Sequence, residues 1–243
     1  MHTVLALIKR LEMFFGFGLR YFIEGGVWLT IGKIAATIAS FVLSVAYARY
    51  LSKDLYGDYR YILSVLGIAG ILALPGIAMA ITRGVARGYE GTFRQGGRTI
   101  FLSSFGISLV GVGIVIYFFF NGNAVLAWGF LVAAIGAPFV EGLGNWRAYL
   151  DGKKEFKRKT LLNLWQQLFN VVIVIGIVAT IVYFRIGAVG SITLLFIAYS
   201  IGKGLPNIII SRNIFRRIPT SAPEEPGSLR YGLHLSALNI PST

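Results

Sequence analysis

The sequence contains no cysteine and only two histidines, His2 and His234, which lie near opposite ends of the chain. The lack of cysteine excludes disulfides and thiolate chemistry. The two distant histidines disfavour a histidine-based metal site or catalytic triad. A paired-carboxylate motif, a metal-ligand spacing, a nucleophile elbow and a phosphate-binding loop are all missing as well. The sequence therefore predicts a protein that is not an enzyme and that binds no metal.

Charge is also scarce, at 14% of the 243 residues, whereas 56% of the residues are hydrophobic. This composition is typical of an integral membrane protein. The net charge of +13 comes from 23 Lys and Arg against 10 Asp and Glu. Such an excess suggests nucleic acid in a soluble protein, but cytoplasmic loops of membrane proteins carry the same excess for orientation. We therefore expect membrane lipids as partners and no nucleic acid.

Hydrophobic segments long enough to cross a bilayer, about 20 residues each, recur along the chain. Helices are the only assignment that fits their length, because helices satisfy their own backbone hydrogen bonds in lipid. The segments lack the short alternating pattern of outer-membrane barrel strands. The sequence predicts an all-α integral membrane protein with six transmembrane helices, placed near residues 27–48, 60–82, 99–120, 124–146, 161–184 and 188–210.

Basic residues fall unevenly between these predicted spans. The outer side is assigned only Arg49, Lys53, Arg60 and Arg185. Because cytoplasmic loops are enriched in Lys and Arg, we expect a multi-pass protein of the cell membrane with its N-terminus in the cytoplasm. The side assigned to the cytoplasm carries Lys9, Arg10, Arg20, Arg83, Arg87, Arg94, Arg98, Arg147, Lys153, Lys154, Lys157, Arg158, Lys159, Arg212, Arg216 and Arg217.

Three regions follow from these patterns. Residues 1–24 are apolar but interrupted by charges, which predicts an amphipathic helix in the membrane interface rather than a signal peptide. Residues 25–217 form the six-helix transmembrane region. Residues 218–243 begin with a linker rich in proline, predicted to be flexible and cytoplasmic. They continue as the truncated start of a seventh membrane segment that is too short to cross a bilayer, and the alternative is a stub that lies in the membrane interface.

The first span carries a polar stripe of Thr30, Lys33, Thr37, Ser40, Ser44 and Tyr47, spaced by three and four residues. This spacing places the side chains on one helix face. A lysine within a hydrocarbon span is costly unless it faces protein or a watery cavity. Lys33 and Thr37 are therefore candidate substrate contacts, and the alternative is a lysine whose long stem reaches the interface.

Spans four to six offer further candidates, each with a simpler structural explanation. Lys203 and Asn207 share a face of span six, although Lys203 is close enough to the helix end to reach the interface. Glu141 in span four can pair with Lys33 or Lys203, or bind a coupling proton or sodium ion. Asn145 in span four, and Asn163 and Gln167 on the amide-rich face of span five, suit sugar hydroxyls but equally suit hydrogen bonds between helices.

A short segment after the first span resembles a known family. It reads Ala48-Arg49-Tyr50-Leu51-Ser52-Lys53-Asp54-Leu55-Tyr56-Gly57-Asp58-Tyr59 and is similar to the signature that follows the first helix of polysaccharide flippases of the multidrug/oligosaccharidyl-lipid/polysaccharide exporter superfamily. Weaker similarities follow in the expected order. They are the start of span one at Gly26-Val27-Trp28-Leu29, the region from Gly76 to Ala86, the turn Asp151-Gly152-Lys153-Lys154-Glu155-Phe156 and the stub Leu229-Arg230-Tyr231-Gly232-Leu233.

The resemblance implies one lobe of a two-lobe transporter, of the kind found in multidrug exporters, that works by alternating access. Such proteins move lipid-linked oligosaccharide or polysaccharide precursors from the cytoplasmic to the outer leaflet, and cationic cavity residues attract the anionic part of the substrate. The second lobe is missing here, so we expect it from a full-length chain, from another chain or from a homodimer. A cation-coupled drug or solute exporter, a membrane enzyme acting on the same lipid, and a truncated product that transports nothing are the alternatives.

Overall fold

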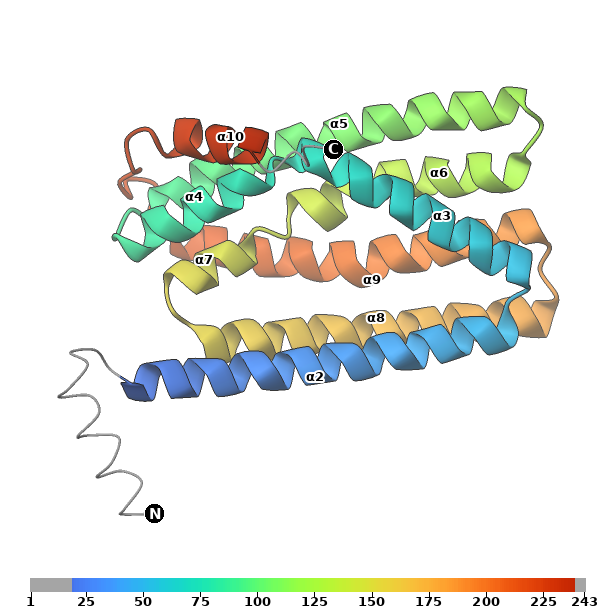
Figure 1. Ribbon diagram of the computed structural model, residues 1–243, viewed down its shortest axis with the longest axis horizontal. Coiled ribbons are helices and arrows are strands. Elements are labelled where there is room, and N and C mark those ends of the chain that lie inside the picture. Colours follow the sequence, from blue (N-terminus) through green and yellow to red (C-terminus); the bar gives the residue numbers. More distant parts are fainter. Residues whose placement is uncertain (1–18, 239–243) are drawn as a thin grey trace, which may run out of the picture.

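Long helices that run the length of one bundle dominate the structure, a computed structural model that describes residues 19–238 (Figure 1). Strands are absent from this part of the chain. The elements are α2 (Leu19–Tyr50), α3 (Lys53–Ala69), the 3₁₀ helix η1 (Gly70–Ala73), α4 (Pro75–Ala86), α5 (Gly91–Phe120), α6 (Ala124–Ala137), the π-helix η2 (Pro138–Gly142), α7 (Trp146–Gly152), α8 (Phe156–Phe184), α9 (Ala188–Arg217) and α10 (Ser228–Leu238).

Five segments are long and apolar enough to cross a membrane, and a bent pair of helices makes a sixth. The structure therefore confirms an all-α, multi-pass membrane protein. The fourth segment extends beyond its predicted end at residue 146 and keeps Arg147 within the span. The segments are Gly25–Tyr50, the pair Lys53–Ala73 and Pro75–Ala86, then Gly91–Phe120, Ala124–Gly152, Phe156–Phe184 and Ala188–Arg217.

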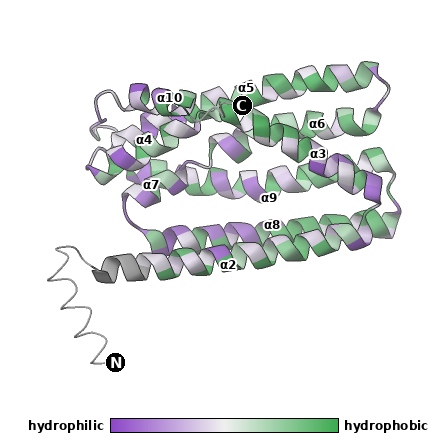
Figure 2. Ribbon diagram, in the orientation of Figure 1, coloured by the Kyte–Doolittle hydropathy of each residue, from purple (hydrophilic) through white to green (hydrophobic). Residues whose placement is uncertain are grey.

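The two ends of the bundle differ in character. One end holds the short turns between α2 and α3, α5 and α6, and α8 and α9, and we call it the turn end. Here Ser52 and Asn123 act as N-caps, because their side chains accept hydrogen bonds from the backbone N–H groups of Leu55 and Leu126 at 3.3 and 3.1 Å. The opposite end, formed by α4, α7, α10 and the termini of α8 and α9, carries many hydrophilic residues (Figure 2). We call it the basic end.

Two buried clusters hold the bundle together. One is centred on Tyr59, Phe130 and Phe196 in the half toward the turn end. The other, around Phe93 and Trp146, lies toward the basic end. Helices within a bilayer associate through close packing and interhelical hydrogen bonds, because lipid tails are as apolar as the side chains themselves. Aromatic pairs within the clusters, such as Tyr59 with Phe196 and Phe93 with Phe215, contribute to this packing.

Two of the spans are broken by proline. The α3–α4 span bends by 50° at Leu74, whose φ of 55° lies in the left-handed region, and Pro75 then opens α4 at a position where its missing N–H costs nothing. The fourth span changes to π-helical geometry at Pro138. Single π-helical turns are frequent at functional sites, and this one contains Glu141 and is followed by Arg147 at the start of α7.

The proline-rich linker, residues 218–227, lies against the start of α5 and the end of α4. Arg94 donates to the carbonyl of Ile218 at 2.9 Å, and the backbone N–H of Gly91 donates to the carbonyl of Pro223 at 3.0 Å. The carboxylate of Glu225 is buried and binds Arg87 at 2.7 Å and Arg83 at 3.4 Å. The linker predicted to be flexible is thus held by specific polar contacts.

Helix α10 follows the linker and packs along α4. Gly76 and Gly232 face the backbone of the opposite helix so closely that neither has room for a side chain. The backbone N–H of Gly76 also donates to the hydroxyl of Ser236 at 3.0 Å. The start of the predicted seventh segment therefore contacts the second span.

Helix α2 packs mainly along α8. Gly25 lies against Phe156 and Gly32 against Thr160, while the hydroxyl of Thr160 donates to the carbonyl of Trp28 at 3.2 Å. Residues 19–24, assigned from the sequence to an interfacial segment, begin α2. The rest of that predicted segment, residues 1–18, lies outside the described residues.

Candidate functional site

Three adjoining hollows run along one side of the bundle, with volumes of about 530, 290 and 240 Å³. The first two share Glu141 and Arg147, and the second and third share Gln167, Asn170 and Lys203. Together they make one channel-like surface, which we call the polar groove. Its polar side chains are Thr82, Asn145, Asp151 and Lys159 toward the basic end, Glu141, Arg147, Asn163, Gln166, Gln167, Asn170, Lys203 and Asn207 in the middle, and Ser40, Ser44, Tyr47, Tyr56, Tyr59, Arg60 and Tyr199 toward the turn end.

Arg147 lies in the middle of the polar groove and is held by neutral oxygens. Its Nε donates to Asn163 Oδ1 at 2.9 Å, its Nη1 donates to the carbonyl of Gly144 at 3.3 Å, and its Nη2 donates to Gln166 Oε1. The guanidinium also lies 4.5 Å from the centre of the Trp146 ring. Among the described residues no carboxylate lies at ion-pair distance from Arg147, so neutral oxygens fix its orientation, while the Glu141 carboxylate lines the same hollows.

Asn207 fixes the break in the fourth span against α9. Its amide nitrogen donates to the carbonyl of Val140 in η2 at 2.8 Å, and its Oδ1 accepts from Trp146 Nε1 and Gln166 Nε2, both at 3.0 Å. Asn207 is only 1% exposed. A π-helix leaves backbone groups without their usual partners, and the Asn207 amide supplies one. Asn207 therefore positions Trp146 and Gln166, which in turn hold Arg147.

Lys203 lies on α9 next to the Asn207 network. Its Nζ is 4.5 Å from the centre of the Tyr199 ring, which is one turn earlier on the same helix. Lys203 forms no ion pair with any side chain of residues 25–238, the side chains that the structure describes. A half-buried ammonium against an aromatic face is a favourable cation–π arrangement that leaves the charge available to an anion.

Glu141 lies on the π-helix and lines the polar groove between Arg147 and Lys203. The sequence suggested an ion pair with Lys33 or Lys203, but neither lysine lies at ion-pair distance from this carboxylate among the described residues. Its side chain is exposed to the groove. The part of the chain that the structure describes contains no cluster of acidic residues and histidines arranged to hold a metal ion.

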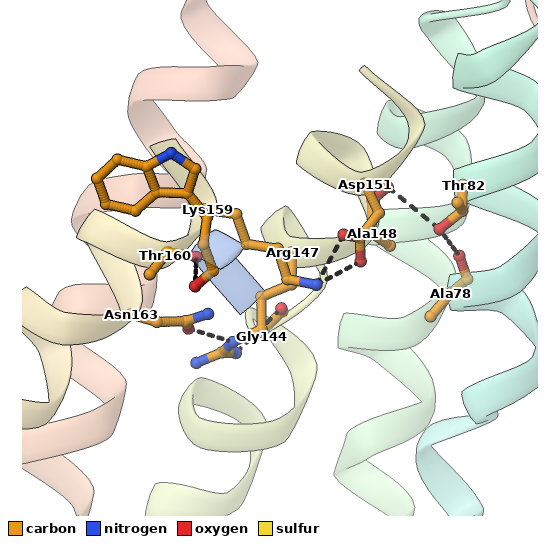
Figure 3. Close-up of polar contacts among 10 residues, drawn as sticks. Ala78, Thr82, Gly144, Arg147, Ala148, Asp151, Lys159, Thr160 and Asn163 are labelled. Carbon is orange, nitrogen blue, oxygen red and sulfur yellow. Dashed lines mark hydrogen bonds and ion pairs between the residues drawn. The ribbon is translucent and has the colours of Figure 1, made fainter. Parts of the chain in front are cut away.

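The wall of the polar groove near the basic end is a network that joins α4, α7 and α8 (Figure 3). Lys159 binds both carboxylate oxygens of Asp151 at 2.7 Å. Thr82 on α4 donates to the carbonyl of Ala148 on α7 at 3.2 Å. Lys159 is thus neutralised locally, unlike Arg147, which Figure 3 shows against Asn163 of α8.

The polar stripe of the first span divides between two environments. Ser40, Ser44 and Tyr47 line the polar groove, and the Tyr47 hydroxyl lies 3.4 Å from that of Tyr59. Lys33 and Thr37 are exposed and line none of its three hollows, and the Thr37 hydroxyl donates to the carbonyl of Lys33 on its own helix at 3.0 Å. The structure therefore places Lys33 and Thr37 outside the polar groove.

The amide candidates also differ in position. Asn163 and Gln167 border the polar groove, and Gln167 Nε2 in addition donates to the carbonyl of Ala36 on α2 at 3.3 Å. Asn145 is 6% exposed and packs against Gly97, and neither end of its amide has a hydrogen-bond partner among the described residues. Of the predicted site residues, the structure brings Glu141, Asn163, Gln167, Lys203 and Asn207 together in the middle of the polar groove, and it places Asn145 in the adjoining hollow toward the basic end.

Arg147 is the central residue that the sequence does not single out, because its position in the chain places it among the basic residues of a predicted cytoplasmic loop. One sequence feature could have found it. The amide-rich face of span five includes Asn163 and Gln166, and amide oxygens on a buried face need donors. A guanidinium, with five N–H groups and no acceptor, is the side chain best able to satisfy several of them at once.

Comparison with known families gives one match. Residues 22–232 match the family described as "Polysaccharide biosynthesis protein". No curated protein and no solved structure matches the chain. The match covers every membrane-spanning segment described above, and members of this family are membrane transport proteins that act in polysaccharide biosynthesis. The chain therefore belongs to the polysaccharide biosynthesis protein family.

Proposed function

We propose that this chain is one lobe of a transporter that flips lipid-linked oligosaccharide or polysaccharide precursors from the cytoplasmic to the outer leaflet. The basic end lies in the cytoplasm in this proposal. A second lobe, from a full-length chain, from another chain or from a second copy, faces the polar groove and closes the cavity. The two lobes rock against each other, so that the cavity opens alternately to each side.

The observation that carries this proposal is the pair of cations in the polar groove. Arg147 and Lys203 lie on membrane-spanning segments and share one hollow with a single carboxylate, that of Glu141, which is at ion-pair distance from neither. Ionisable groups at this depth are costly and mark substrate or ion pathways. Two cations against one carboxylate leave a net positive charge in this hollow, which fits a substrate whose lipid and sugar are joined through phosphate groups.

The remaining groove residues suit the sugar. Asn163, Gln167 and Asn170 offer amide groups, and Ser40 and Ser44 offer hydroxyls, along a path between the two ends of the bundle. Such groups exchange hydrogen bonds with sugar hydroxyls without requiring one fixed geometry. The polar side chains of the groove thus replace the hydrogen bonds to water that the sugar loses when it leaves the cytoplasm.

A complementation assay tests the proposal in a host whose polysaccharide export depends on this protein. The double variant Arg147→Gln and Lys203→Gln should abolish export while its abundance in the membrane stays normal. The control is the double variant Arg216→Gln and Arg217→Gln, which removes two charges from α9 outside the polar groove and should leave export intact. Full export by the groove variant would overturn the proposed role of the two cations.

Lys33 and Thr37 are expected to face the second lobe. Both are exposed on α2, on a membrane-spanning segment that is only 6% buried in this chain. A lysine in that position needs a protein or water-filled environment, and a facing lobe supplies one. Replacing Lys33 with Gln should therefore reduce export when the second lobe is present. It should leave the stability of the described bundle unchanged.

A cation-coupled exporter of drugs or other solutes is the second candidate, and Glu141 is the observation that favours it. This carboxylate lies on a π-helix, faces the polar groove and has no ion-pair partner among the described residues. Loss of transport in Glu141→Gln, together with a proton or sodium flux that depends on a drug, would support this candidate. Transport of lipid-linked sugar without such a flux would exclude it.

A further inference from the structure

A second hollow lies away from the polar groove, between α6 and α9. It has a volume of about 530 Å³, within the range of small-molecule sites, and its lining is almost entirely apolar. We call it the α6–α9 groove. Its walls are Ile135 and Phe139 on one side, and Ile201, Leu205 and Ile208 on the other.

Small residues form the floor of the α6–α9 groove. A side chain at Gly136 would collide with Ser200, and a side chain at Gly204 would lie 3.2 Å from the β-carbon of Phe139. The two helices therefore approach closely at these points, while the larger residues on either side stand away from each other. The result is a fixed slot rather than a gap between loosely packed helices.

The slot opens on the outer surface of the bundle. Both of its helices belong to membrane-spanning segments, and Ile135, Ile201 and Leu205 are 64%, 44% and 42% exposed. On α9 the polar groove uses Tyr199, Lys203 and Asn207, whereas the slot uses residues on the opposite face of the same helix. An occupant of the α6–α9 groove therefore does not reach the proposed transport path.

One basic side chain continues the slot toward the basic end. Arg212 lies one helical turn beyond Ile208, on the same face of α9. It is exposed, and among the side chains that the structure describes, those of residues 25–238, it has no ion-pair or hydrogen-bond partner. An apolar slot in the hydrocarbon region that ends at a free guanidinium matches the two parts of a phospholipid, because guanidinium groups bind phosphate well.

We propose that the α6–α9 groove binds an acyl chain of an anionic phospholipid whose headgroup phosphate is held by Arg212. The occupant is a lipid of the membrane itself and not the transported substrate. The site faces the bilayer permanently, so the lipid stabilises the contact between α6 and α9. The proposal does not rest on the transport function.

Native mass spectrometry of the protein released from bilayers of mixed phosphatidylglycerol and phosphatidylethanolamine tests the headgroup contact. The wild type should retain phosphatidylglycerol in preference to phosphatidylethanolamine. Arg212→Gln should weaken that preference about fivefold, corresponding to roughly 1 kcal/mol for one basic side chain near the surface. Arg217→Gln is the matched control, because it removes a charge from the same helix end but from another face. Equal effects of the two substitutions would overturn the headgroup assignment.

Photo-crosslinking tests the acyl-chain contact with a phosphatidylglycerol that carries a photoreactive group on one chain. Crosslinks should fall on the α6 and α9 segments that line the slot. Ile201→Trp should reduce them by filling it, whereas Ile209→Trp, at an isoleucine of similar exposure outside the slot, should not. Both variants should elute from size exclusion as the wild type does. Equal crosslinking in the two variants, or displacement of the probe by an isoprenoid phosphate, would overturn the assignment to a membrane phospholipid.

Discussion

Trp146 Nε1 donates a hydrogen bond to Asn207 Oδ1 at 3.0 Å, and both side chains are almost completely buried. The bond joins the residue next to Arg147 in the fourth span to the middle of the sixth. Since Asn207 also bonds to Val140, a single amide holds the π-helix, the indole and the residues around Arg147 in one arrangement. The position of the candidate binding charge therefore depends on a buried contact between distant parts of the chain.

Asn207→Leu should destabilise the protein. The substitution keeps the side-chain volume but leaves the N–H of Trp146, the N–H of Gln166 and the carbonyl of Val140 without this partner. A buried polar group left unpaired costs about 1–3 kcal/mol, so the free energy of unfolding should fall by about 2–3 kcal/mol. Asn213→Leu, at an exposed position of the same helix, is the control. Equal stability of the two variants in a detergent unfolding assay would contradict the role given to Asn207.

Glu225→Ala should loosen the linker and α10. The change removes the carboxylate that binds Arg87 and Arg83, and hydrogen bonds to charged groups contribute about 1.5–3 kcal/mol. Amide hydrogen exchange in residues 228–238 should become faster. Glu224→Ala removes an exposed neighbouring carboxylate and should not change the exchange rate. Unchanged protection in Glu225→Ala would show that the helix contacts alone hold α10.

The contact between Glu90 and Lys153 should make stability depend on pH. The hydrogen bond from Lys153 lowers the pKa of the Glu90 carboxyl below its usual value of 4.5, against the opposing effect of partial burial. Because the pKa of Glu90 is lower in the folded state, its contact with Lys153 adds to the free energy of unfolding at pH values above the unfolded pKa. This contribution is lost as the pH falls through the folded pKa.

Unfolding measured from neutral pH down to about pH 3 should therefore show a smaller loss of stability in Glu90→Gln than in the wild type. Lys153→Gln should behave similarly, because it removes the group that lowers the pKa. A steeper loss in Glu90→Gln would contradict the assigned direction of the shift.

Gly76→Ala should displace α10 from α4. A methyl group at Gly76 would meet backbone atoms of Gly232 and Ser236, and backbone cannot move aside as a flexible side chain can. Gly67→Ala is the control, since nothing lies within 4 Å of the methyl group that it adds to the same span. Hydrogen exchange in α10 should rise in the first variant only, and equal exchange in both would argue against the close approach of the two helices.

Much of this architecture could be predicted from the sequence. Length and hydropathy alone determine how many segments can cross a bilayer, which is why the predicted spans agree with the helices. The same reasoning placed Lys203, Asn163 and Gln167 among the polar residues of membrane-spanning helices. It did not predict the polar contacts that hold the linker, because the partners of the Glu225 carboxylate, Arg83 and Arg87, lie far away in the sequence.

The polar stripe on α2 shows what helical periodicity alone does not predict. Spacing places Lys33 and Tyr47 on one helix face, yet only the part of the stripe near Tyr47 lines the polar groove. Which part of a face meets its neighbours depends on how two helices cross, and the crossing is set by contacts such as Gly32 against Thr160. The sequence of one helix does not contain that information.

By itself, the sequence determined an all-α membrane protein with little acidic charge, no cysteine and a strong asymmetry of basic residues. These properties depend on the composition and length of individual segments, so they can be read from one segment at a time. Only the tertiary structure decided that Arg147 belongs to the candidate site, because its position results from the π-helix at Pro138 and the buried amide of Asn207. Both features arise from packing between spans, where each residue's environment is supplied by residues that are distant in the chain.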